Sequence, residues 1–387
     1  MKDLLERMSD FSPETRRNAL EEFCGLIRTG NLRRRTSAGE RLNLHLHTFH
    51  SFNCLWWSPS RIVAEGWMED LRYLGTVDFD SLDGLEETKQ AGRLLGMEVM
   101  GGFESRVFLR EYADKVINSP KEPGIFYLCG KGFPRVPDPA GDAGRFLLGM
   151  RRTAQERNRA VVRKLNAFLG AVEIDFEQDV LPLTPSGNPT ERHIVLAYQR
   201  CSEKTLGRNV DRFWADILHL PEDECRRLRT DRPQDFQEQV RTTLVKFGGP
   251  GYIAPDVREF PLFDDVVAMT KAAGGIPVGT WLDGTNPGEE NPQQLVSLLR
   301  EKGIEAITII PERNWNIRNL AEKREKVANL DEFFSVCIRM RMPVVCGTEM
   351  NKFGQPFVDD FSQPELKKYL PYLLESARRL MERSRQE

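Results

Sequence analysis

Short apolar segments rich in β-type residues recur along this chain, and helix-patterned segments separate several of them. The predicted strands lie at 42–46, 73–77, 97–100, 124–128, 276–278, 306–310 and 343–346. The predicted helices between them lie at 60–70, 85–95, 262–273, 292–302 and 331–340. Strands and helices that alternate at this spacing indicate parallel βαβ units. Seven predicted strands favour a closed α/β barrel over an open sheet.

The strand pattern stops in the middle of the chain and resumes later. Helical stretches take its place at 144–170, 190–206 and 212–218. Near the start, Ser12 and Pro13 have the pattern of a helix N-cap and first helical residue. We therefore expect an α/β fold, a closed barrel with an inserted α-helical domain. The expected parts are an N-terminal helical extension (1–40) and a first barrel part (41–137), followed by the helical insertion (138–249). The second barrel part, with a C-terminal helix, is expected at 250–387.

Charge and composition argue against several classes of protein. Fifty-five Lys and Arg against 58 Asp and Glu give a net charge of −3, so we expect a small-molecule substrate and no nucleic acid. No stretch approaches the roughly 18 apolar residues that a membrane span needs. The first residues include acids and lack the apolar core of a secretory signal, which predicts a cytoplasmic protein. The seven scattered cysteines are expected to be free thiols.

Histidine is rare in this chain but clustered. Three of the five histidines, His45, His47 and His50, lie within six residues. His45 and His47 end the first predicted strand, and strand alternation places both imidazoles on one face. Two neutral imidazoles on one face can bind the same divalent cation. The sequence therefore indicates a metal site, with two hydrogen-bonded structural histidines as the alternative.

The segment that contains these histidines has the sequence HLHTFHS. It resembles the H-x-H-T-x-x-S motif that opens the PHP phosphoesterases, a family named for polymerase and histidinol phosphatase domains. Asp78 and Asp80 stand in a segment similar to the family's T-D-H-D motif, and Glu104 ends one similar to G-x-E. Glu349 lies in a segment similar to G-S-D-x-H. The resemblance implies a distorted (β/α)7 TIM-like barrel of the PHP type and metal-dependent phosphoesterase activity.

The resemblance also implies a reduced metal site. Histidines of the family pattern are replaced here by Phe79, Phe126, Trp281 and Asn351. Family members bind up to three metals, and these replacements exclude a full three-metal site. The residues that match the family's first metal are His45, His47, Glu104 and Glu349. Two imidazoles and two carboxylates suit one divalent ion, Zn²⁺, Mn²⁺ or Fe²⁺.

Four charged residues are the expected catalytic groups: Asp78, Asp80, Arg106 and His193. The aspartates follow a strand end, where they could hold a ligand, a water or an imidazole, with helix capping near 84 as the alternative. Arg106 follows Glu104 by two residues and so faces the same side. It is expected to hold an anionic substrate group, with a surface arginine as the alternative. His193 is expected to act as acid or base, with a structural histidine as the alternative.

The expected substrate-binding residues combine basic, aromatic, amide and acidic groups: His50, Asn53, Arg106, Arg192, Trp281, Asp283 and Asn351. Arg192 and His193 lie on the insertion, in a segment weakly similar to an R-P-H-like sequence of the family's nucleoside-bisphosphate phosphatases. We expect this segment to cover the site. Such a lining suits sugar hydroxyls as well as phosphate. For Trp281 the alternative is packing at the end of the barrel.

These features predict a metal-dependent hydrolase, specifically a phosphoesterase that uses a metal-activated water on a small phosphorylated or sugar-like metabolite. The missing histidines support one alternative, a barrel that has lost catalysis and binds a metabolite or a partner. A metal-dependent sugar isomerase or lyase, which would use the same ligands, is the other alternative.

Overall fold

The computed structural model describes residues 1–35, 40–254 and 260–385. The chain divides into two compact units, which we call the barrel unit and the helical unit. The barrel unit consists of Met1–Phe49, Asn53–Leu148 and Phe260–Glu387, and the helical unit of His50–Phe52 and Gly149–Glu259. The tripeptide His50–Phe52 therefore groups with the helical unit, although its neighbours in the chain belong to the barrel unit.

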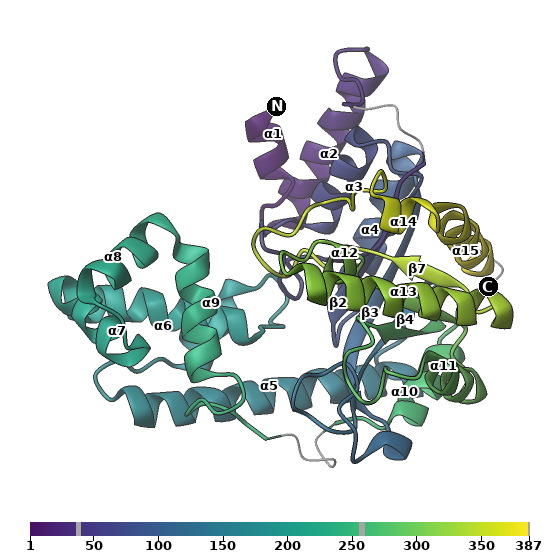
Figure 1. Cartoon of the computed structure of the whole chain (residues 1–387). Helices are drawn as coiled ribbons and strands as arrows, with labels where there is room; N and C mark the ends of the chain where they lie inside the picture. The colour runs from purple at the N-terminus through teal and green to yellow at the C-terminus, as the bar shows by residue number, and fades with distance from the viewer. Residues whose placement is uncertain (36–39, 255–259, 386–387) are drawn as a thin grey trace. The chain divides into compact units, whose positions relative to one another are not determined.

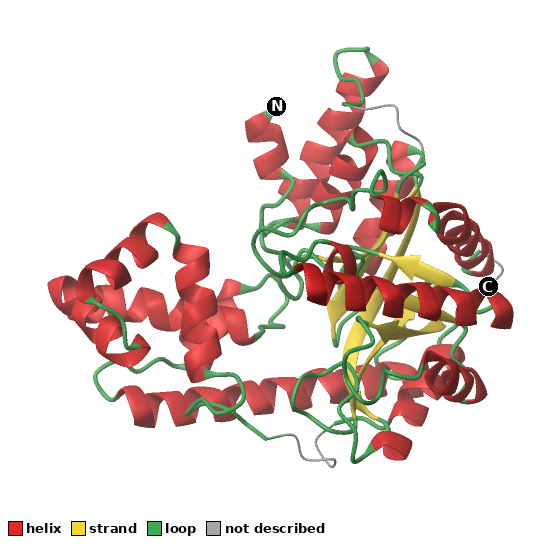
Figure 2. Ribbon diagram, viewed as in Figure 1, coloured by secondary structure: helices red, strands yellow, loops and turns green. Residues whose placement is uncertain are grey.

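A seven-stranded sheet with its strands in chain order forms the centre of the barrel unit (Figures 1 and 2). The strands are β1 (Leu42–His47), β2 (Tyr73–Phe79), β3 (Glu98–Phe108), β4 (Ile125–Lys131), β5 (Ile276–Trp281), β6 (Ala306–Ile309) and β7 (Val344–Cys346). Beyond β7, the Glu349 N–H donates to the His45 carbonyl and the His47 N–H donates to the Glu349 carbonyl, each at 2.8 Å. These bonds join the two ends of the sheet. The predicted barrel is confirmed as a nearly closed seven-stranded sheet.

The direction of β4 differs from the prediction. We expected parallel strands throughout, but β4 is antiparallel to both β3 and β5, so this part of the prediction is wrong. A parallel neighbour needs a crossover connection, usually a helix. The connection between β3 and β4 contains only the 3-10 helix η1 (Arg110–Tyr112), and β3 itself extends to Phe108 instead of ending near 100. The chain therefore returns along the edge of β3.

Helices surround the strands of the barrel unit (Figure 2). They are α1 (Lys2–Arg7), α2 (Pro13–Arg28), α3 (Pro59–Met68), α4 (Leu85–Leu95), α10 (Phe263–Ala272), α11 (Pro292–Glu301), α12 (Glu312–Trp315), α13 (Leu320–Met340), α14 (Pro364–Lys367) and α15 (Leu370–Arg383). Helix α2 begins as predicted, because the Ser12 hydroxyl accepts a hydrogen bond from the Thr15 N–H and Pro13 occupies the first turn.

The helical unit has its own apolar core. Helix α5 begins in the barrel unit and continues into the helical unit (Figure 1). The elements are α5 (Asp142–Leu169), the π-helix η2 (Phe176–Val180), the 3-10 helices η3 (Leu181–Leu183) and η4 (Gly207–Asn209), α6 (Glu191–Leu206), α7 (Val210–Leu218), α8 (Glu222–Asp231) and α9 (Pro233–Leu244). Trp214 and Phe236, which meet edge to face at 5.5 Å, lie in its core with Ile194 and Leu165.

Two further observations concern the whole described chain. No helix in the described ranges combines the length and the apolar character that a bilayer span requires. All seven cysteines are free thiols, and most of them are buried.

Candidate metal centre

Two histidines of β1 and one glutamate of β3 form a cluster in the barrel unit. Glu104 Oε1 lies 3.6 Å from His45 Nε2, and Glu104 Oε2 lies 3.2 Å from His47 Nε2. One possible ligand atom from each residue lies within 4.8 Å of the others. All three side chains are buried. Among the residues that the structure describes, this is the only such group of three His, Cys, Asp or Glu side chains.

The strand register explains why these residues meet. His45 and His47 are two apart on β1, so they face the same side of the sheet. Phe79 of β2 is the direct register partner of Glu104, so these residues share that face. The Phe79 ring stacks on the His47 imidazole, with ring centroids 4.4 Å apart. Phe79 occupies a position where the PHP pattern has a histidine, and here it packs against a candidate ligand.

The electrostatics of the cluster favour ligand-ready protonation states. Burial, together with the nearby charge of Lys131, lowers the pKa of His45 and so favours the neutral imidazole. Burial opposes ionisation of Glu104, but His45 and His47 outweigh it and hold the pKa of this carboxyl well below its usual range. Neutral imidazole and ionised carboxylate are the forms that bind metals.

One atom of this cluster lacks a hydrogen bond. His45 Nε2 is buried and has no hydrogen-bond partner in the described structure, while Nδ1 of the same ring lies 4.0 Å from Cys129 Sγ. Buried polar atoms in proteins are almost always paired. A divalent cation between the two imidazoles and the carboxylate would satisfy this nitrogen. The donor set therefore fits a metal ion.

Lys131, which the sequence analysis did not single out, also lies inside the barrel. Its side chain is fully buried at the end of β4, and its ammonium donates to the Leu44 carbonyl. Burial lowers its pKa. Lys131 pairs in register with Gly102, two residues before Glu104. The sequence offered little signal for this role, because Lys131 lies three residues after the predicted strand at 124–128. The pairing of Lys131 with Gly102 in the antiparallel register places it on the face that Glu104 shares.

Glu349, the fourth expected ligand, contacts the cluster through its backbone. Its carboxylate lies outside the group of three. Glu349 Oε2 accepts a hydrogen bond from Gln355 Nε2 at 3.1 Å and lies 3.7 Å from an Arg313 nitrogen. Asn351 is half-buried in the same loop. The structure therefore brings three of the four expected metal ligands together. It places the fourth, Glu349, in the segment after β7, where its backbone pairs with β1.

The two expected catalytic aspartates hold loops at the site. Asp78 is buried, and its carboxylate accepts hydrogen bonds from the Thr48 N–H at 2.9 Å and the Thr48 hydroxyl at 2.7 Å. Asp80 accepts a hydrogen bond from the Ser105 hydroxyl at 2.5 Å. Asn53, expected to bind substrate, donates instead to the His47 carbonyl at 2.8 Å. Asp78 and Asn53 fix the turn that follows β1, and Asp80 joins the turn after β2 to strand β3.

Three other expected residues have partners within the protein. Arg106 forms an ion pair with Glu122, and its guanidinium lies over the Phe260 ring. Trp281 is buried and stacks face to face on Phe333 of α13 at 4.3 Å, so it packs against the helix layer. Asp283 accepts hydrogen bonds from the backbone and hydroxyl of Thr285 and lies 3.1 Å from Lys326 Nζ.

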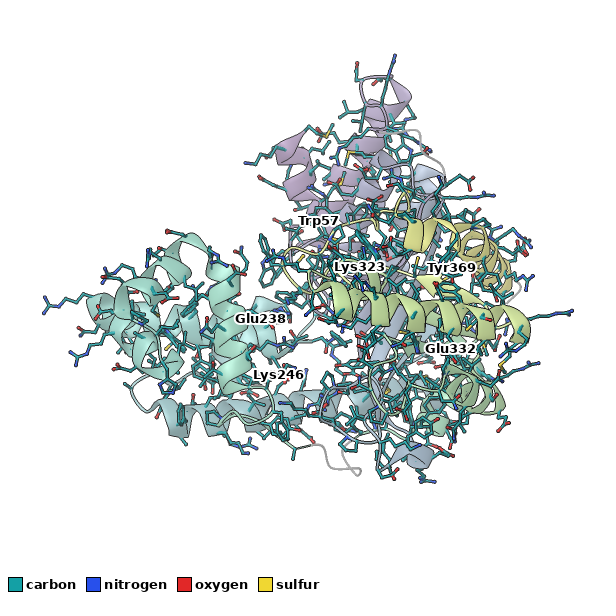
Figure 3. The ribbon with its side chains drawn as sticks, in the orientation of Figure 1. Trp57, Glu238, Lys246, Lys323, Glu332 and Tyr369 are labelled. Carbon is teal, nitrogen blue, oxygen red and sulfur yellow. The ribbon has the colours of Figure 1, made fainter. Side chains whose placement is uncertain are left out.

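The remaining expected residues belong to the helical unit. His50 Nδ1 lies 3.1 Å from the Ser186 hydroxyl oxygen. Arg192 forms an ion pair at 2.7 Å with Glu238, a residue labelled in Figure 3. The Arg192 guanidinium also lies over the Phe52 ring. His193 is buried, and its Nδ1 accepts the Thr190 N–H at 3.0 Å, which caps α6. This is the structural role that the sequence analysis gave as the alternative for His193.

Burial of His193 predicts a loss of stability in acid. Burial, with the charge of Arg192, lowers the pKa of His193 to about 3. Below a pH of about 6.5, His193 binds a proton in the unfolded chain but stays neutral in the folded chain. The free energy of unfolding therefore falls as pH falls. Between about pH 6.5 and pH 5, chemical denaturation should show wild type losing roughly 2 kcal/mol more than His193→Gln.

Glutamine suits the variant because it can keep the α6 cap without titrating. The control is His219→Asn, because His219 is exposed and in a left-handed conformation that asparagine tolerates. This control should follow the wild-type pH dependence. Equal pH dependence in wild type and His193→Gln would contradict the prediction.

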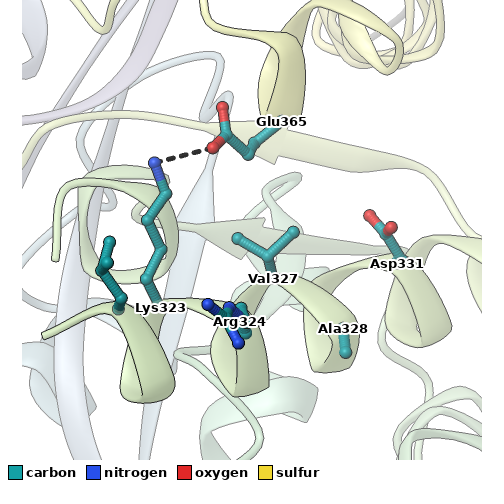
Figure 4. A pocket seen from close by; sticks show the side chains of 7 residues that line it. Lys323, Arg324, Val327, Ala328, Asp331 and Glu365 are labelled. Atoms are coloured by element: carbon teal, nitrogen blue, oxygen red, sulfur yellow. Dashed lines mark ion pairs between the residues drawn. The ribbon is translucent and has the colours of Figure 1, made fainter.

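A shallow pocket lies on α13, apart from the metal-centre residues (Figure 4). Its volume is about 320 Å³. Its lining residues are Leu320, Lys323, Arg324, Val327, Ala328, Asp331 and Glu365. Lys323 and Glu365 form an ion pair at 2.7 Å across it. None of the expected site residues lines this pocket.

Comparisons with known proteins show a likeness of fold. No family model matches the sequence, and no curated protein matches it. An amidohydrolase from Chromobacterium violaceum, solved with sulfate and no metal, is 17% identical, with a TM-score of 0.55 over 87% of this chain and 96% of that one. A proposed metal-dependent phosphoesterase from Bifidobacterium adolescentis is 15% identical, with a TM-score of 0.57 over 88% and 96%. This chain therefore shares its overall fold with these two structures.

Proposed function

We propose that this protein is a metal-dependent hydrolase of the PHP type that binds one divalent cation at His45, His47 and Glu104. The observation that carries this proposal is the buried cluster, in which the carboxylate lies between two imidazoles and His45 Nε2 has no hydrogen-bond partner. The substrate that we propose is a small phosphorylated or sugar-like metabolite. The two structures of similar fold, a metal-dependent phosphoesterase and an amidohydrolase by name, support the same class of reaction.

A bound cation would polarise a substrate oxygen and lower the pKa of a bound water. The chain's own residues supply the rest of the site. Glu104 provides the negative charge that holds the cation. Asp78 fixes Thr48, the residue after His47, and so holds the end of β1 in place. We retain Glu349 as a candidate fourth ligand, because its backbone pairs with both His45 and His47.

A second candidate function is a barrel that binds a metabolite or partner without catalysis. The packing of Phe79 on His47 favours this candidate, because an apolar ring fills a position from which a second metal could be held. A single metal lacks the paired clamp that many phosphoesterases use. The two functions differ in turnover, which an assay measures directly.

Metal analysis of the purified chain tests the proposal. We expect about one equivalent of Zn, Mn or Fe per chain, as three clustered ligands bind one ion. Mass spectrometry gives the stoichiometry, and release of phosphate from p-nitrophenyl phosphate gives the activity before and after chelation. Chelation should abolish the activity, and the same metal should restore it. Metal-bound protein that turns over no phosphate ester or sugar substrate would favour the binding function. Protein that takes up no metal after reloading would contradict both the site and the proposed reaction.

A further inference from the structure

Arg313 lies at the end of the barrel where the candidate metal centre is found. It belongs to α12, which directly follows β6. Strands β1, β2, β3, β5, β6 and β7 run parallel where they neighbour one another, and in such barrels the loops after the strands meet at one end. Arg313 has its nitrogen 3.7 Å from Glu349 Oε2. Glu349 in turn is bonded through its backbone to His45 and His47.

The guanidinium of Arg313 keeps most of its hydrogen-bonding capacity. Its side chain is 44% exposed, and the long contact to Glu349 is its one ion pair within the described ranges. Glu349 Oε2 already accepts a hydrogen bond from Gln355. Arginine carries five N–H donors in a planar fork that matches phosphate and carboxylate oxygens. Several donors of Arg313 therefore remain for a ligand.

The other acids near Arg313 are bound to groups of their own. The Glu349 carboxylate does most to raise the pKa of Arg313, and Tyr127 and Asp283 act in the same direction. Asp283 is paired with Lys326. The Glu289 carboxylate accepts the N–H groups of Leu282, Asp283 and Gly284. Arg313 is charged, as arginine is throughout the ordinary pH range, and Glu349 is the one acid that forms an ion pair with it within the described ranges.

Arg106, which the sequence predicted to hold an anionic substrate group, forms an ion pair within the protein. Glu122 neutralises it, and the Ser119 hydroxyl donates to the same carboxylate at 2.5 Å. The Arg106 side chain is 19% exposed, less than half the exposure of Arg313. Of these two arginines, Arg313 is the one that can meet a negatively charged substrate.

We propose that Arg313 binds the phosphate group of the substrate and so determines the preference of this enzyme for anionic substrates. The proposal rests on the proposed function, because it places the phosphate beside the metal centre. Arg313 would act by direct contact through its fork of N–H donors.

Binding of inorganic phosphate to the full-length protein tests this role. Isothermal titration of wild type, Arg313→Gln and Arg313→Lys is carried out with and without added metal. We expect Arg313→Gln to weaken phosphate binding by about tenfold or more. Arg313→Lys should recover part of the affinity, because it keeps the charge but loses the fork. The control is Arg324→Gln on α13, which removes an exposed arginine from the lining of the α13 pocket and should bind phosphate as wild type does.

The metal content of each variant separates this inference from the proposed function. Unchanged metal content with weaker phosphate binding in Arg313→Gln supports the direct contact. Loss of metal from Arg313→Gln would mean that Arg313 acts through Glu349, and would overturn it. Wild-type phosphate affinity in Arg313→Gln would also overturn it and leave the metal site intact. Phosphate binding that depends on Arg313 in a protein that takes up no metal would support the arginine's role and refute the metal-dependent reaction.

Discussion

Replacing Glu104 with glutamine should remove the bound cation and lower the rate of hydrolysis by at least about 10³-fold, or roughly 4 kcal/mol of transition-state stabilisation. Glu104 supplies the only carboxylate in the group of three ligands. Its pKa is held low by the adjacent imidazoles, so it is ionised at neutral pH. Glutamine has a similar size but carries no charge, so two neutral imidazoles would be left to hold the cation. Metal content by mass spectrometry and activity after reloading measure the two effects.

The matched control is Glu332→Gln, which removes an exposed carboxylate from α13 (Figure 3). This variant should keep wild-type metal content and rate. Glu104→Asp, which retains the charge on a shorter side chain, should bind metal more weakly than wild type and better than Glu104→Gln. Stoichiometric metal and a rate within threefold of wild type in Glu104→Gln would show that the cation, if any, is held elsewhere.

Asn43→Ala should lower the free energy of unfolding by about 3–5 kcal/mol, because several buried hydrogen bonds are lost together. Asn43 is fully buried on β1. Its amide donates to the Thr348 hydroxyl and to the Phe357 carbonyl, each at 2.8 Å, and its oxygen accepts the His45 N–H at 3.1 Å. The two bonds that the amide donates join the first strand to the segment after the last strand, where the sheet closes.

Urea denaturation followed by circular dichroism measures this effect. Asn316→Ala is the control, because Asn316 is exposed and, among the described residues, its side-chain amide donates only to the Glu312 carboxylate at the start of α12. It should change stability by less than about 0.5 kcal/mol. If Asn43→Ala were no less stable than this control, the closing bonds would contribute nothing to stability.

The shared face of His45 and His47 could be predicted because it depends on a local rule. Alternation along one strand puts the two histidines on one face. Glu104 was expected only from the resemblance of its segment to the G-x-E motif. Its place beside the histidines depends on the register of β3 with β2, which no pattern within its own strand shows.

The roles of Lys131, Arg106 and Arg313 could not be predicted in the same way. An apolar strand has the same sequence pattern whether it runs parallel or antiparallel to its neighbours. The antiparallel direction of β4 therefore could not be predicted from the sequence. That course turns Lys131 inward and brings Glu122, sixteen residues along the chain, to Arg106. Arg313 meets Glu349 only because the sheet closes on itself, which joins residues far apart in the sequence.

Trp281 illustrates a different limit. Its place at a strand end was predicted, but a residue at a strand end can face either the barrel interior or the helices. The Phe333 ring on α13 decides the question, since it offers a flat apolar partner at 4.3 Å. The sequence around Trp281 contains no pattern that indicates this partner, because Phe333 lies far away along the chain.

The grouping of His50–Phe52 with the helical unit has a consequence for how such a chain can change over time. His50 pairs with Ser186, and the Phe52 ring meets His193 at 5.4 Å. Deleting the long helical segment would strip both side chains of these partners, only three residues after a candidate metal ligand. A chain that lost this helical segment would therefore leave both side chains without these contacts in the turn after β1, unless the tripeptide changed as well.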